Sequence, residues 1–150
     1  MFGELEGLKA ERPTPEEINP QKFVVCLIDT ESERPQLIDT TGGLKEWYKL
    51  LNCKCIDIQA RTLDGVEYDF IFDDEAPIKP GAKVSALDKD GQPQLIGRLV
   101  ICHCDAEGNE TGLHKSDIEI LKRHICILEG RPSEEGEKPP TWAAIYNLDN

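Results

Sequence analysis

The sequence has few of the features that membrane and secreted proteins carry. Apolar runs such as Leu99–Ile101 are far shorter than the roughly 20 residues that cross a bilayer. The first residues, Met1–Glu4, contain no basic segment and no apolar segment, so we expect no secretory signal. We therefore expect a cytoplasmic protein that does not bind a membrane.

Positive charge is also scarce. Lys and Arg number 17 against 29 acidic residues, and the net charge is −12. Because affinity for nucleic acids comes mainly from Lys and Arg contacts to phosphate, the composition disfavours direct nucleic-acid binding. A basic protein partner is compatible with this charge. An acidic mimic of DNA, which inhibits by offering carboxylates in place of phosphates, is an alternative that requires regular rows of carboxylates on one surface.

The composition changes along the chain and predicts its organisation. Hydrophobic residues make up 39% of the 150 residues, which suffices for one modest core and one domain. Residues 1–21 are polar and predict an acidic arm, whereas 22–128 predict the folded body. Residues 129–141 are typical of a linker. Apolar residues return in 142–150 and predict a tail that docks on the body or on a second copy, which would form a homo-oligomer.

Two alternating stretches, 53–62 and 66–73, predict a β-hairpin. A three-residue loop over 63–65 pairs Ile58 with Phe70 and places apolar side chains of both strands on one face. A two-residue turn formed by the last two of these loop residues would set apolar residues opposite polar ones. The hydrophobic pattern therefore predicts the three-residue loop.

Further apolar segments predict the other elements. The run Phe23–Ile28 predicts a buried strand, 82–87 a short strand, and 94–104 one long strand. Helical spacing of apolar residues predicts two amphipathic helices, one over 44–51 and one that starts near Ser116. Because strands outnumber helices, the order predicts an α+β fold: a mostly antiparallel mixed sheet with both amphipathic helices packed on it.

Polar residues before each predicted helix indicate where it begins. Thr40 or Thr41 can cap the first helix. Ser116 and Glu119 have the spacing of a capping box for the second.

Short motifs follow one another through the middle of the chain. They are Asp39–Leu44 before the first helix, Val84–Gly91, Leu95–Ile101 with its small residue before an apolar run, and Glu107–Leu113 before the second helix. Over roughly 23–125 this order resembles a family of small bacterial and phage domains of unknown function, found in Firmicutes, phages and mobile elements. The resemblance implies an accessory protein of a bacterium or a mobile element, and it implies no reaction.

Two cysteine pairs are the candidate metal ligands: Cys53, Cys55, Cys102 and Cys104. Residues i and i+2 share a face of a strand, so four thiols would converge on a zinc ion if the two strands were neighbours. The C-x-C spacing is a weaker zinc signal than C-x₂-C, and the register places the first pair opposite the apolar face. The favoured interpretation is therefore that these cysteines are small apolar residues that hold no metal.

Catalytic signals are lacking as well. His103 points away from Cys102 and Cys104 in a regular strand, so it cannot serve as their base. The glycine pair Gly42–Gly43 precedes a helix, but the Lys-Ser/Thr of a phosphate-binding loop does not follow. We expect no enzyme and no cofactor. The sequence predicts a non-catalytic accessory or protein-interaction domain with an unidentified protein partner, and the alternatives are a structural zinc protein and an acidic DNA mimic.

Overall fold

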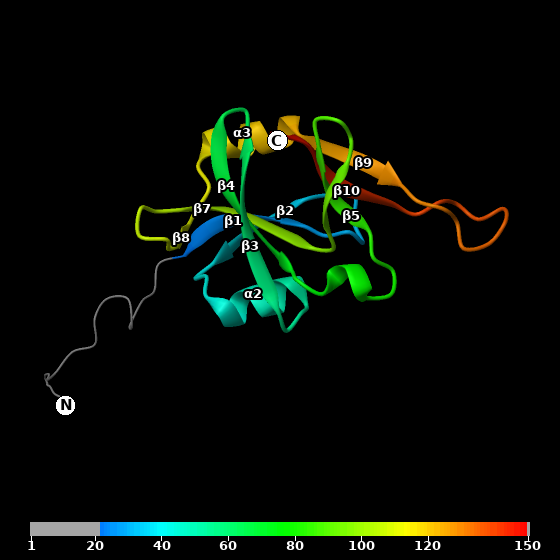
Figure 1. The fold of residues 1–150 in the computed structure, drawn as a ribbon, viewed down its shortest axis with the longest axis horizontal. Helices are drawn as coiled ribbons and strands as arrows, with labels where there is room; N and C mark the ends of the chain where they lie inside the picture. Colours follow the sequence, from blue (N-terminus) through cyan, green and yellow to red (C-terminus); the bar gives the residue numbers. More distant parts are fainter. Residues whose placement is uncertain (1–21, 150) are drawn as a thin grey trace, which may run out of the picture.

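The computed structural model describes residues 22–149 as an α+β fold with mostly antiparallel strands, as predicted (Figure 1). The acidic arm predicted for 1–21 lies outside the described residues. The elements in chain order are β1 (Phe23–Ile28), β2 (Gln36–Thr40), α2 (Leu44–Leu51), β3 (Ile56–Leu63), β4 (Val66–Asp73), a 3₁₀ turn (Ala76–Ile78), β5 (Val84–Asp88), β6 (Pro93–Ile96), β7 (Leu99–Cys104), β8 (Glu110–Thr111), α3 (Lys115–Arg123), β9 (Ile125–Glu129) and β10 (Thr141–Leu148). Within 22–149, no helix is long and apolar enough to cross a membrane.

Within these residues the strands form two sheets rather than the single sheet predicted. The larger sheet has the order β2-β1-β7-β4-β3, and β8 extends β7; all its pairings are antiparallel. The smaller sheet has the order β6-β5-β10-β9, in which β10 runs parallel to β5. Figure 1 shows α2 and α3 on opposite sides of the larger sheet.

Each face of the larger sheet carries its own apolar cluster, because successive side chains of a strand point to opposite faces. The cluster under α2 consists of Val25, Leu27, Trp47, Leu51, Ile71, Val100 and Cys102. The other cluster joins the larger sheet to α3 and the smaller sheet, through residues that include Phe70, Ile101, Leu121 and Ile145. The larger sheet is therefore a middle layer of the core.

The β3–β4 hairpin has a two-residue turn at Asp64–Gly65, so the predicted three-residue loop is wrong. Ile58 lies opposite Ile71 rather than Phe70. Both turn residues have positive φ, 52° and 80°, which is the type I′ turn that favours Asp-Gly. The prediction assumed that β4 has one apolar face. In the structure Phe70 and Ile71 are both fully buried on opposite faces, so the alternation of β4 does not select one register.

The long strand predicted over 94–104 is two strands, β6 and β7, which belong to different sheets. The chain breaks at Gly97, which has a φ of +87°. A Cβ at Gly97 would lie 2.7 Å from the Cβ of Ala76. Glycine adopts this conformation without strain and has no Cβ that would clash there. Gly97 therefore allows the chain to pass from the smaller sheet to the larger one at this point.

The structure also corrects both predicted helix starts. The N-cap position of α2 is Gly43, so neither predicted threonine occupies it. The capping box of α3 is formed by His114 and Asp117 rather than by the predicted pair. The cause in α3 is the buried carboxylate at position 117, which accepts the backbone N–H of His114 at 2.7 Å.

Residues 141–148 form β10, which lies between β5 and β9 in the smaller sheet. Trp142, Ile145 and Leu148 are buried, whereas Tyr146 is partly exposed. The apolar segment that the sequence predicts as a docked tail is thus an inner strand of the smaller sheet. The residues between Glu129 and Thr141, predicted as a linker, connect β9 to β10 and project from the body in Figure 1.

Candidate functional site

The four candidate metal ligands do not come together. They are Cys53, Cys55, Cys102 and Cys104. The strand β4 lies between β3 and β7, so the two pairs are not on neighbouring strands. Cys102 is level with Asp69 of β4, and Asp69 is level with Ala60 of β3. Cys55 precedes Ala60 by five positions, about 16 Å of extended chain. Among residues 22–149, no group of three or more His, Cys, Asp or Glu side chains is placed to hold a metal ion.

The buried thiols are also poorly suited to nucleophilic chemistry. Burial raises the pKa of Cys26 to about 12 and also raises the pKa of Cys102. A reactive cysteine needs a lowered pKa, because the thiolate is the nucleophile. These two thiols therefore serve as packing groups.

Cys53 lines a hollow of about 550 Å³ at the end of α2, together with Tyr48, Lys49, Asn52, Lys54, Glu75 and Lys79. Three lysines there would suit an anion. However, Lys79 Nζ is paired with the buried Asp73 at 2.6 Å, and Glu75 adds a second negative charge. The hollow consequently offers little net positive charge to a ligand.

A buried polar cluster lies where α3 begins. Asp117, only 4% exposed, accepts hydrogen bonds from the Tyr68 hydroxyl at 2.9 Å and the His114 backbone N–H at 2.7 Å. Nε2 of His103 lies 2.8 Å from the same carboxylate. Burial opposes ionisation of Asp117, but the three donors outweigh it and lower its pKa. Because these groups satisfy one another, the cluster holds α3 on β4 and β7 rather than awaiting a substrate.

A second cluster joins the β3–β4 turn to the end of α3. Nε2 of the buried His124 lies 3.0 Å from Asp64, and its Nδ1 lies 3.0 Å from the carbonyl oxygen of Tyr146. Arg123 donates to Asp64 at 2.9 Å. The hydrogen bonds from Arg123 and His124 lower the pKa of Asp64. These contacts tie together parts of the chain that are distant in sequence.

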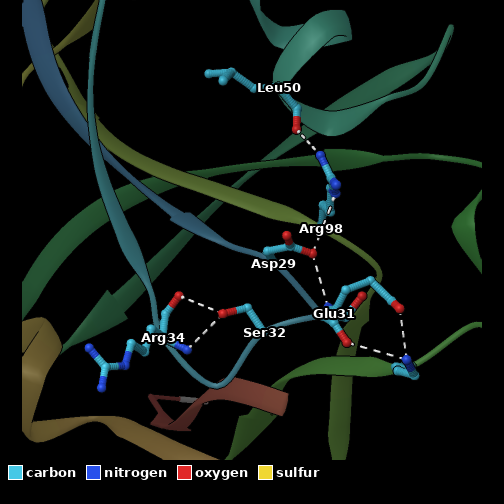
Figure 2. Close-up of polar contacts among 8 residues, drawn as sticks. Asp29, Glu31, Ser32, Arg34, Leu50 and Arg98 are labelled. Atoms are coloured by element: carbon cyan, nitrogen blue, oxygen red, sulfur yellow. Dashed lines mark hydrogen bonds and ion pairs between the residues drawn. The ribbon is translucent and has the colours of Figure 1, made fainter. Parts of the chain in front are cut away.

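A third polar cluster lies where the two sheets meet (Figure 2). Arg98, at the break between β6 and β7, donates to the carbonyl oxygen of Leu50 at 3.0 Å, and its Nε lies 3.6 Å from Asp29. The backbone N–H of Glu31 donates to Asp29, and the Glu31 carboxylate pairs with Lys83 at 2.7 Å. Each charged group has a partner within the protein, so this cluster is a structural tie between the sheets and α2.

An apolar groove of about 330 Å³ differs from these self-contained clusters. Its lining residues are Cys26, Pro35, Leu37, Ile118, Leu121, Lys122 and Ile125. They come from β1, the start of β2, α3 and the start of β9. The one charged member, Lys122, lies 3.7 Å from Glu119. The groove therefore presents mainly apolar surface to solvent.

Two open strand edges accompany the groove. Within 22–149, β2 pairs only with β1, and β9 only with β10. Leu37 of β2 is 55% exposed and Ile127 of β9 is 50% exposed. Proteins usually protect such edges with charges, prolines or bulges, so exposed apolar residues on an edge are typical of a surface that pairs with another chain.

The sequence did not reveal this groove. Leu37, Ile118 and Ile125 lie in three separate segments, and each fits the pattern of an ordinary core residue. Their partial exposure depends on where the fold places α3 relative to β2, and a local sequence pattern carries no information on that arrangement.

Comparisons with protein-family models, curated proteins and solved structures gave no match. The resemblance to a family of unknown function stays a prediction. The case for function therefore rests on the groove and the strand edges.

Proposed function

We propose that this chain is a non-catalytic protein-interaction domain of a cytoplasmic bacterial or mobile-element protein. The observation that supports this proposal is the apolar groove beside the open edge of β2, with Leu37 more than half exposed. The proposal places both amphipathic helices on the larger sheet. Residues of α3 then form one wall of the groove. The polar clusters, which satisfy themselves internally, support a binding role over a catalytic one.

The partner in this proposal is a different protein rather than a second copy. Each copy carries a net charge of −12, so two copies repel each other. Trp142 and Ile145, which would have joined two copies through a tail, are buried in their own chain. A partner of opposite charge would instead be attracted and would associate faster.

A structural zinc protein and an acidic DNA mimic both have less support. The four candidate thiols lie too far apart for one zinc ion, because β4 separates the strands that carry or follow them. For a DNA mimic, the apolar groove and the exposed Leu37 are the wrong kind of surface, and they favour a protein partner instead.

The proposal is tested by site-specific photo-crosslinking in the host cell. A photoreactive residue replaces Leu37 in one variant and Ile58 in the control; Ile58 is 42% exposed on the edge strand β3, outside the groove. We expect one protein to crosslink from position 37 and not from position 58. That protein, once purified, should bind the wild-type chain and lose about tenfold or more in affinity with Leu37→Asp, but not with Ile58→Asp. The same crosslinks from both positions, or equal affinities of the two Asp variants, would contradict the proposal.

A further inference from the structure

The edge strand β2 carries an apolar and an acidic residue side by side. Leu37 and Asp39 are two positions apart, so they point to the same face of the strand, the face on which Leu37 lines the groove. Both residues are exposed. A chain laid along this edge would therefore meet one apolar and one negative side chain in succession.

The backbone of β2 adds a second recognition element. Its five residues pair with β1 on one side, and within 22–149 no strand pairs with the other side. The unpaired N–H and C=O groups of an edge strand bind an extended segment by adding it to the sheet, and alternate side chains of that segment then enter the adjacent pocket.

The charge of the surroundings selects among such segments. Lys122 is partly offset by Glu119, and the whole chain carries a net charge of −12. Opposite charges directly across a strand pair are stabilising, and like charges are destabilising. The acidic residues 1–21, which contain five Glu, and a second copy are both disfavoured as occupants for this reason.

From these observations we infer that β2 binds an extended cationic segment of another protein, which adds to the larger sheet as a further strand. Its groove-facing side chains are an apolar residue beside Leu37 and a Lys or Arg beside Asp39, two positions apart. This inference rests on the proposed function and names the chemistry of the partner.

A symmetric peptide tests the inference without fixing the direction of the added strand. The probe is the blocked peptide Thr-Lys-Thr-Val-Thr-Lys-Thr, and the control peptide has Glu in place of both Lys. Each is titrated into the isotope-labelled full-length chain, and the amide chemical shifts are followed by NMR at low and high salt. We expect the cationic peptide to shift amides of β2 and of the groove, more weakly at high salt, and the Glu peptide to bind several-fold more weakly.

Two acidic residues on different edges provide the matched variants. Asp39→Asn should lower the affinity for the cationic peptide about two- to fivefold and reduce its advantage over the Glu peptide. Asp57→Asn, an exposed site on the edge strand β3, should leave both affinities unchanged. Equal effects of the two variants, or shifts centred on β3, would overturn the inference.

Hydrogen exchange of the free protein addresses other occupants. Outward-facing amides of β2 should exchange fast at low protein concentration, because no strand among residues 22–149 pairs with them. Strong protection there would show that residues 1–21 or a second copy already cover the edge, which overturns the inference. If the peptide fails to bind while crosslinking from position 37 still identifies a partner, strand addition is wrong and the proposed function stands.

Discussion

The buried carboxylate of Asp117 accepts hydrogen bonds from three donors that lie on β4, β7 and the start of α3. Asp117→Asn keeps the shape of the side chain, but it removes the charge and replaces one acceptor oxygen with an NH₂ donor. This donor must face either the Tyr68 hydroxyl or the side that holds His103 and the His114 N–H. The orientation in which the NH₂ group faces Tyr68 costs less stability, because the tyrosine hydroxyl can rotate and accept its hydrogen bond.

The expected loss of stability follows from these contacts. A hydrogen bond to a charged group contributes about 1.5–3 kcal/mol, against about 0.5–1.5 kcal/mol for a neutral one. Asp117→Asn replaces three hydrogen bonds to a charged group by weaker bonds to a neutral one, at a site that is almost fully buried. The free energy of unfolding should therefore fall by about 2–4 kcal/mol. For a chain of this size that lowers Tm by about 4–16 °C. Glu119→Gln, at an exposed site on the same helix, should change Tm little.

The direction of the pKa shift of Asp117 predicts how the loss of stability depends on pH. The pKa of Asp117 is lowered in the folded state, so its contribution is complete above the unfolded value of 3.8 and is lost as the pH falls through the folded value. Circular-dichroism melts should therefore show the full gap in Tm between wild type and Asp117→Asn at pH 7. The gap should narrow below about pH 4. A Tm at pH 7 equal to that of Glu119→Gln, or a gap that stays constant into acid, would refute the reasoning.

Two further predictions concern the junction of the sheets and β10. Gly97→Ala should lower Tm clearly, because the new Cβ would lie 2.7 Å from the Cβ of Ala76 at a φ of +87°. The control is Gly91→Ala, which has a similar φ of +78° but open space around it, so it shows the cost of the backbone conformation without the clash. An equal loss of Tm in the two variants would count against the close approach at Gly97. On a Trp47→Phe background, Trp142 should emit at short wavelength and resist acrylamide quenching, because it is buried and donates to a backbone carbonyl at 2.7 Å. A water-like emission spectrum would contradict the burial of β10.

The local elements could be predicted because their signals lie in consecutive residues. The apolar run Phe23–Ile28 forms β1, and the helical spacing of Trp47 and Leu51 forms α2 with the predicted bounds. A short continuous run of branched apolar residues fits a buried strand, and apolar residues three and four positions apart fit a helix, so nothing distant in the chain is needed to choose either element. Asn52 ends α2 at a φ of 51°, a left-handed conformation that asparagine tolerates.

What joins these elements was decided by tertiary structure. The register of β3 and the break at Gly97 depend on which faces of β4 and β7 are buried. Both faces are buried, because α2 packs on one side of the larger sheet, and α3 and the smaller sheet pack on the other. The sequence left open whether the two cysteine pairs lie on neighbouring strands, and the position of β4 between β3 and β7 separates them. The order of strands in a sheet depends on pairing between segments that are distant in sequence, and a local pattern of residues does not predict that pairing.

The candidate site shows the same division. Composition alone determined that any partner meets a chain of net charge −12, and this charge disfavours direct nucleic-acid binding. The groove exists only because the fold brings α3 near β2 and leaves Leu37 and Ile118 partly uncovered. Residues more than 80 positions apart acquire a joint role only when the fold places them together, because burial is a property of the packed layers and not of the residue itself.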